Sequence, residues 1–132
     1  MAIEADAKNW SWVVERACPQ CGFDPAAVAF RRIPGLLRED ARRWGAVLAA
    51  PAARIRPDDS AWSPLEYAAH VRDMLRVFTD RFALMLSEDD PTFENWDQDA
   101  AAIDEQYNEQ DPRSSHSSLP PRPTRPPLCW TR

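Results

Sequence analysis

The segment from residue 63 to residue 87 constrains the fold most, because it combines a helix start with a long apolar stripe. The sequence Ser-Pro-Leu-Glu at positions 63 to 66 is a capping box with proline at the first helical position. The stripe consists of Tyr67, Val71, Met74, Phe78, Phe82 and Met85. Because these apolar residues recur at the spacing of one helix face, we predict a helix from about Pro64 to Ser87 with one side toward a core.

Two further amphipathic segments accompany this helix. One runs from about Pro34 to Ala49, and the other from about Gln98 to Asn108. A short helical turn is expected from Asp24 to about Phe30, with the aspartate as cap. The segment from Asn9 to Arg16 alternates loosely and is predicted to be extended. The fold class is therefore all-α, a partial up-and-down four-helix bundle with a short extended N-terminal segment.

The end of the chain differs sharply in composition. All 21 acidic residues lie at or before Asp111, whereas residues 112–132 hold four arginines and six of the 13 prolines. So many prolines predict a disordered or polyproline-like tail. The tail is either a genuine basic arm or an out-of-frame reading of a GC-rich gene. The expected division is an N-terminal segment of residues 1–24 with a CxxC motif, a partial bundle of residues 25–111, and the tail.

Composition excludes several classes of protein. A net charge of −5 argues against nucleic-acid binding. No apolar run is long enough for a membrane span, and the polar, acidic N-terminus does not resemble a signal peptide. An odd number of cysteines suits a reducing compartment better than a disulfide framework. We therefore expect a cytoplasmic protein without nucleic-acid or membrane partners.

Three sequence strings resemble the DinB-like superfamily, which also contains the mycothiol-dependent maleylpyruvate isomerases. They are Trp-Ser-Pro-Leu-Glu-Tyr at 62–67 leading to His70, Phe-Glu-Asn-Trp-Asp-Gln-Asp-Ala at 93–100, and Cys-Pro-Gln-Cys-Gly-Phe-Asp at 18–24. The last two are similar to a small actinobacterial branch of the superfamily. The resemblance covers roughly residues 9 to 111.

The resemblance implies a four-helix bundle, often dimeric, that binds a divalent metal such as zinc or nickel. It also implies a thiol cosubstrate such as mycothiol. One family ligand is a histidine in the second helix, which falls on His70. The others are typically a His-x-x-x-His pair, or a Glu and His at that spacing, in the last helix. The resemblance stops after Asp111, and the only other histidine, His116, lies in the Pro-rich tail. His70 is thus the single metal ligand of an incomplete site, in a chain truncated relative to the family or out of frame after Asp111.

Two carboxylates share the His70 side of the predicted helix. Glu66 and Asp73 would orient the imidazole as hydrogen-bond partners. Each has a plainer explanation, because the capping box accounts for Glu66 and a solvated helix face accounts for Asp73. His70 itself could be a core histidine with one hydrogen bond.

Three other side chains are candidates for binding. Arg81 would contact an anion, or else extend along the core and pair with a surface acid. Cys18 and Cys21 would form half a zinc knuckle or a redox dithiol, or else simply belong to a structured turn. The carboxylates between Glu88 and Asp111 lack calcium-loop spacing and are read as a solvated face. No catalytic residue is assigned.

Two functions of different classes remain. The first is metal-dependent, thiol-using transferase or isomerase chemistry, which the resemblance implies as ancestry. The second is a non-catalytic helical domain for dimerisation or interaction, which we favour as the activity of this chain. Because a truncated bundle leaves apolar surface uncovered, we expect a homodimer.

Overall fold

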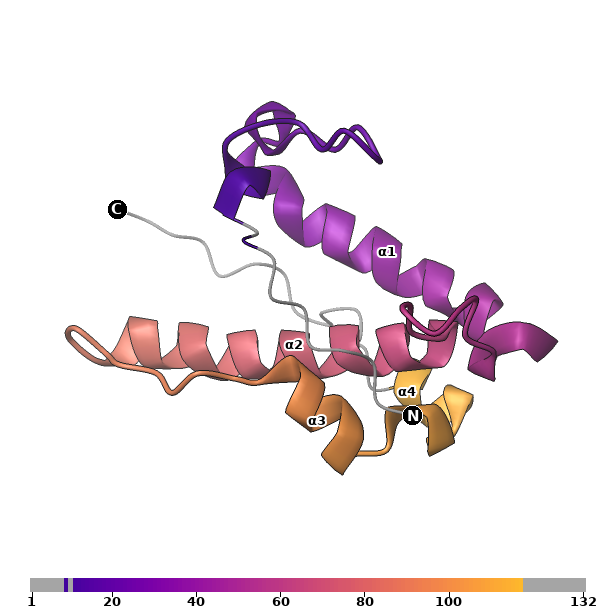
Figure 1. Cartoon of the computed structure of the whole chain (residues 1–132). Coiled ribbons are helices and arrows are strands. Elements are labelled where there is room, and N and C mark those ends of the chain that lie inside the picture. The colour runs from indigo at the N-terminus through magenta and orange to yellow at the C-terminus, as the bar shows by residue number, and fades with distance from the viewer. Residues whose placement is uncertain (1–8, 10, 118–132) are drawn as a thin grey trace.

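The computed structural model describes residue 9 and residues 11–117, and within them it contains helices and 3₁₀ turns but no strand. The predicted all-α class is confirmed. The two long helices, α1 (Ile33–Leu48) and α2 (Pro64–Ser87), lie close where α1 ends and α2 begins, and they diverge from there (Figure 1). The four-helix bundle topology stays a prediction.

The bounds of both long helices follow the sequence signals. At the start of α2, the Ser63 hydroxyl accepts the Glu66 backbone N–H at 3.2 Å, and the Glu66 carboxylate accepts the Ser63 N–H at 2.8 Å. This is the predicted capping box. The helix α1 ends just before Pro51, which opens the 3₁₀ turn η4 (Pro51–Arg54). The predictions for both helices are confirmed to within a residue.

The third predicted helix is shorter than expected. The Asp97 carboxylate caps α3 (Gln98–Asp104) by accepting two N–H groups of its first turn, at 3.0 and 2.9 Å. Gln106 then adopts a left-handed conformation with φ of 48°, which ends the helical path. A 3₁₀ turn, η5 (Tyr107–Glu109), follows and buries Tyr107. The prediction of one helix to residue 108 is wrong because this break redirects the chain to place Tyr107 inside.

The start of the predicted tail is helical, which corrects the expectation of disorder from Pro112 onward. The helix α4 (Pro112–Ser117) packs against α1 and α2. Its start has a physical cause, since the Asp111 carboxylate accepts the Arg113 N–H at 3.1 Å and proline occupies the first helical position. The rest of the predicted tail, including Cys129, lies outside the described residues.

The N-terminal segment also departs from prediction. Instead of an extended stretch, the chain forms the 3₁₀ turn η1 (Ser11–Val14). The Asn9 side chain accepts the Ser11 N–H at 2.9 Å and so bends the chain locally. The two residues after Val14 continue the turn by donating their N–H groups to the Trp12 carbonyl.

The expected helical turn after Asp24 is present as two short pieces. They are the 3₁₀ turns η2 (Pro25–Ala27) and η3 (Phe30–Arg32). The Asp24 carboxylate accepts the Ala26 N–H at 3.0 Å, as predicted for a cap.

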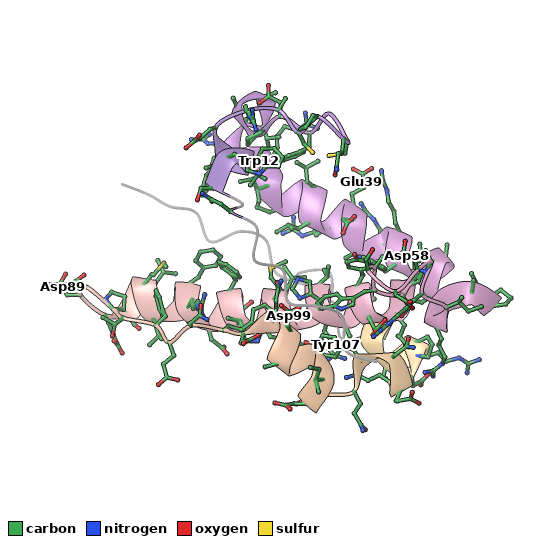
Figure 2. All side chains as sticks on the ribbon, viewed as in Figure 1. Trp12, Glu39, Asp58, Asp89, Asp99 and Tyr107 are labelled. Carbon is green, nitrogen blue, oxygen red and sulfur yellow. The ribbon has the colours of Figure 1, made fainter. Side chains whose placement is uncertain are left out.

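The core is small and lies where the end of α1, the turn η4 and the start of α2 meet. The buried apolar residues among those described are Leu48, Ala53, Leu65, Ala68, Ala69 and Tyr107. Trp44 packs against this group from α1. Asp89, in the turn after α2, lies at the opposite end of the molecule from Asp58, far from this core (Figure 2). Among the described residues, no helix is both long and apolar enough to cross a membrane.

Candidate functional site

His70 lies on α2 between two tryptophan rings. Its imidazole stacks on Trp96 with ring centroids 5.5 Å apart and planes 7° apart. It meets Trp62 edge-on, with centroids 5.3 Å apart and an interplanar angle of 60°. The His70 Nδ1 atom is buried and has no hydrogen-bond partner among the described residues. The two rings therefore hold an imidazole with one unsatisfied nitrogen.

The charge state of His70 follows from its surroundings. Burial lowers the pKa of the imidazole, and the negative charges of Asp73 and Asp99 oppose this only in part. Because an unperturbed histidine has a pKa of about 6.5, His70 is neutral near pH 7. A neutral imidazole with an available nitrogen can bind a metal or accept a proton.

Asp73 does not hydrogen-bond to His70, contrary to one of its two predicted roles. Its carboxylate accepts two bonds from Arg72, at 2.8 and 2.6 Å, and one from Arg76 at 3.1 Å. The side chain is only 17% exposed, so the solvated alternative is also wrong. Burial by itself would raise the pKa of Asp73, but the bonds from Arg72 lower it overall. Asp73 thus influences His70 through its charge alone.

Glu66 likewise directs its bonds away from His70. Besides the capping box, its carboxylate accepts two hydrogen bonds from the Arg56 guanidinium, one of them from Nε at 2.9 Å. Burial would raise the pKa of Glu66, but the bonds from Arg56 and Ser63 lower it overall. The capping explanation is confirmed, and the buried ion pair is a further role that the sequence did not reveal.

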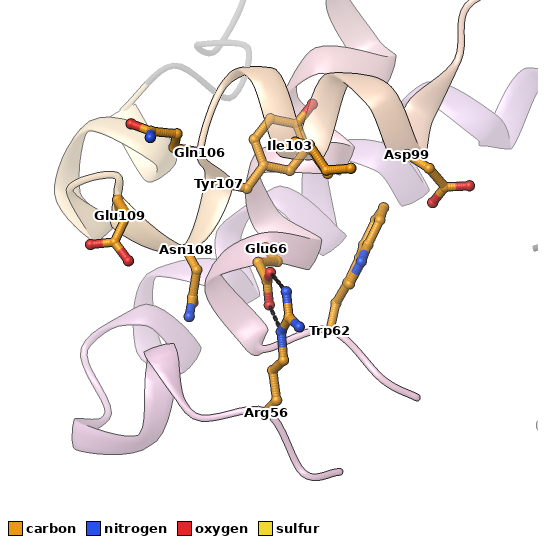
Figure 3. A pocket seen from close by; sticks show the side chains of 10 residues that line it. Arg56, Trp62, Glu66, Asp99, Ile103, Gln106, Tyr107, Asn108 and Glu109 are labelled. Atoms are coloured by element: carbon orange, nitrogen blue, oxygen red, sulfur yellow. Dashed lines mark hydrogen bonds and ion pairs between the residues drawn. The ribbon is translucent and has the colours of Figure 1, made fainter. Parts of the chain in front are cut away.

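An open pocket of about 470 Å³ lies beside this ion pair (Figure 3). Its described lining consists of Arg56, Trp62, Glu66, Asp99, Ala102, Ile103, Gln106, Tyr107, Asn108 and Glu109. Its charged lining residues are Arg56, Glu66, Asp99 and Glu109, and Arg56 and Glu66 pair with each other. Trp62 links the pocket to His70, because its ring also contacts the imidazole.

Tyr107 is the second buried side chain with an unsatisfied polar atom. Its Oη has no hydrogen-bond partner among the described residues, and its ring meets Trp62 edge-on with centroids 6.5 Å apart. Burial and the neighbouring Asp73 carboxylate raise the pKa of its phenol, so it stays protonated in the physiological range. His70, Asp73 and Tyr107 therefore form one polar cluster beside Trp62.

This cluster does not make a complete metal site. Among residues 9 and 11–114, whose side chains are described, no three histidine, cysteine, aspartate or glutamate side chains gather closely enough to hold a metal ion. The orphaned His70 nitrogen suits a ligand position. Of the two carboxylates whose charge acts on His70, Asp73 is paired with Arg72 and Arg76, and Asp99 alone does not complete a ligand set. The described donor set therefore does not fit the divalent metal of the family that the sequence resembles.

The remaining candidates lie apart from the cluster. Arg81 donates to the Glu94 backbone carbonyl at 2.8 Å and lies over the rings of Phe78 and Phe93, 5.6 Å from each centroid. It thus extends along apolar surface, as its alternative role predicts, but it binds a carbonyl rather than an acid. Cys18 and Cys21 are free thiols in the turn before η2. The backbone N–H groups of Cys21 and Gln20 lower the pKa of the Cys18 thiol.

Sequence reasoning missed four side chains that build the cluster. Trp62 and Trp96 enter the sequence analysis only as parts of two family strings, and Arg72 does not enter it. The helical spacing of the segment 98–108 puts Tyr107 on an apolar face, but not beside His70. A periodicity argument cannot place Trp96 on His70, because a loop brings it to α2.

Comparisons with family models, with curated proteins and with solved structures found no match to this chain.

Proposed function

We propose that this chain is a DinB-like helical protein in which His70 occupies one ligand position of the family's divalent-metal site, without the rest of that site. The family assignment rests on the three sequence strings. Thiol-dependent transferase or isomerase chemistry is accordingly proposed as the ancestral activity. Among the described residues, no three histidine, cysteine, aspartate or glutamate side chains gather closely enough to hold the metal of such chemistry.

The observation that supports this proposal is the state of the His70 imidazole. It is neutral near pH 7, held by Trp62 and Trp96, and leaves a buried nitrogen unsatisfied. Leaving a buried polar atom unpaired costs about 1–3 kcal/mol. A buried unsatisfied group in a folded protein calls for an explanation, and a ligand position at His70 provides one.

A second candidate function is association with a second copy, as a non-catalytic helical module. The observation that favours it is the uncovered apolar surface of the long helices. Exposed apolar residues on α1 and α2 are Ile33, Leu36, Leu37, Val47, Tyr67, Phe78, Phe82, Leu84, Met85 and Leu86. Large apolar surfaces of this kind are typical of interfaces. A homodimer would cover them.

Metal content tests the first proposal. The full chain is purified without an affinity tag, and zinc and nickel are measured by mass spectrometry in the Cys18→Ser/Cys21→Ser background, so that thiols do not contribute. We expect well below one equivalent per chain, and no change when His70→Ala is added. One equivalent that His70→Ala removes would show that the site is complete and would overturn the incompleteness proposed here.

Sequencing the gene beyond the Asp111 codon, and translating its other reading frames, tests the family assignment itself. We expect another reading frame after the Asp111 codon to continue into an amphipathic helix with a His-x-x-x-His pair. If no frame does so, the family's other metal ligands are missing from the gene as well, and the assignment of His70 to a metal-ligand position is not supported. The association function then becomes the better conclusion.

Light scattering tests the association function with a matched pair of variants. Phe82 on α2 and Phe23 outside the helices are 55% and 54% exposed, so equal substitutions alter equal surface. In the Cys18→Ser/Cys21→Ser background, which removes any metal-mediated contact, we expect a dimer whose dissociation constant rises about tenfold or more in Phe82→Ser, equivalent to about 1.4 kcal/mol, and is unchanged in Phe23→Ser. A monomer in this background with a cooperative melt would contradict association.

A further inference from the structure

The turn that carries Cys18 and Cys21 has a closed backbone geometry. The Gly22 N–H donates to the Cys18 carbonyl at 2.8 Å, and the Cys18 N–H donates to the Phe23 carbonyl at 2.8 Å. Gly22 has φ of +72°, a conformation that a glycine adopts without strain. These two bonds fix the path of the chain between the cysteines.

The closed turn also determines how the two sulfurs are presented. Cys21 is exposed and Cys18 is half-buried, and both are free thiols. The turn therefore presents two sulfur ligands to solvent.

A redox role fits this turn less well than metal binding does. Reactive CxxC motifs commonly place the first cysteine at the N-terminus of a helix that follows a strand. Here the next element is the three-residue 3₁₀ turn η2, which begins only at Pro25, and the residues described contain no strand. A C-x-x-C pair in a turn closed at Gly22 instead has the ligand spacing of structural zinc sites.

Two thiolates fill only half of a tetrahedral zinc site. Among the described residues no third histidine, cysteine or carboxylate joins the pair. The segment containing the turn lies with the start of α1 at one extremity of the molecule, away from α2 (Figure 1). A second copy related by twofold symmetry could therefore bring an identical pair to it, and four cysteines are a common structural zinc set.

We propose that Cys18 and Cys21 form a two-thiolate half-site for zinc, and that the same pair in a second copy completes a four-thiolate site. Binding releases the thiol protons, one from each cysteine that is not already ionised, and involves no change of oxidation state. This site is separate from His70 and does not depend on the function proposed above.

Cobalt titration of the reduced, metal-free full chain tests the proposal, because tetrahedral cobalt–thiolate complexes absorb strongly. We expect saturation at half an equivalent per chain, with the charge-transfer intensity of four sulfurs per cobalt. Zinc should displace the cobalt. Light scattering should show two chains per bound ion.

Substitutions assign the ligands. Cys18→Ser and Cys21→Ser should each abolish the four-sulfur spectrum, with circular dichroism confirming that the helices persist. Cys129→Ser is the matched control and should bind as the wild type does. His70→Ala should also bind normally, which separates this site from the metal position proposed above.

Three results would overturn the shared site. They are saturation at one equivalent per chain with two sulfurs per cobalt, loss of binding in Cys129→Ser, and no binding at all. The second would mean that the third ligand comes from the same chain.

Discussion

The two halves of α2 share one continuous helix but differ in what surrounds them. In the first half, Leu65 is fully buried at 0% exposure, and Ala68 and Ala69 beside it are buried as well. In the second half, Phe82 is 55% exposed and Leu86 is 79% exposed. Figure 1 shows α3 and α4 beside the first half, whereas the loop of residues 88–97 runs along the second.

Long-range polar bonds explain why the first half is so well held. The Ser63 hydroxyl bonds to the Asn108 side chain at 2.7 Å, and Arg72 donates to the Gln110 side chain at 2.6 Å. Arg54 donates to the Gln110 carbonyl at 2.7 Å. These bonds tie the start of α2 to residues about forty positions later. Because most helical stability in proteins comes from packing rather than from propensity, we expect the covered first half of α2 to be the more stable one.

The largest expected effect is a difference in unfolding free energy between leucine-to-alanine substitutions in the two halves of α2. Leu65→Ala should destabilise the protein by about 2–5 kcal/mol, because it removes a fully buried side chain and leaves a cavity. Leu86→Ala should change stability by less than about 0.5 kcal/mol, because the side chain is already in water. Chemical denaturation followed by circular dichroism measures both.

Similar losses of unfolding free energy in Leu65→Ala and Leu86→Ala would contradict the difference between the two halves of α2. They would mean that the second half of α2 is covered in solution, as in a dimer. Repeating the measurement at several protein concentrations separates the two cases, since dimer stability depends on concentration.

A smaller loss of stability is expected when the buried ion pair between Arg56 and Glu66, at the start of α2, is broken. Glu66→Ala removes the cap partner of Ser63 and leaves Arg56 without its carboxylate, which should cost about 2–4 kcal/mol. Glu66→Gln keeps an acceptor for the cap and removes only the charge, so its loss should be smaller. Thermal melts at neutral pH compare the two variants. Equal losses would show that the charge, and not the cap, provides the whole stabilisation.

The sequence predicted local structure better than the contacts between distant segments. The capping box and the apolar stripe fix α2 because both depend on neighbours a few residues apart. The pairing of Arg56 with Glu66 and the burial of Tyr107 depend on how loops return to the helix, which no local spacing encodes. The short helix after Asp111 could have been predicted, since its start repeats the Asp-Pro signal recognised at Asp24.

The same limit applies to the candidate site. The helical spacing placed His70 at the edge of the core and put Asp73 on its side of α2, and both lie in one cluster. The spacing could not show that Glu66 and Asp73 both form ion pairs with arginines, because an ion pair depends on side-chain reach as well as on position. It also could not show the two tryptophans around the imidazole, one of which comes from the loop after α2.

The smallest expected effect is a pH dependence carried by His70. Because its pKa is lower in the folded protein than in the unfolded chain, the unfolded chain takes up the proton first as the pH falls. Stability is therefore unaffected well above pH 6.5 and declines as the pH falls below that value, by less than about 1.4 kcal/mol per pH unit for one group. Glu66 and Asp73 have lowered pKa values, so their own losses begin only at more acidic pH.

His70→Phe isolates this effect, because phenylalanine can still stack on Trp96 but cannot take up a proton. Unfolding free energies measured from pH 8 to pH 5 should decline in the wild type and decline less in the variant, with parallel curves above pH 7. If the two curves stay parallel down to pH 5, His70 is protonated as easily in the folded protein as in water, and if the wild type gains stability on acidification, it is protonated more easily. The tryptophan pair would then not shield the imidazole, and the first half of α2 would be more open to solvent around His70 than its buried neighbours indicate.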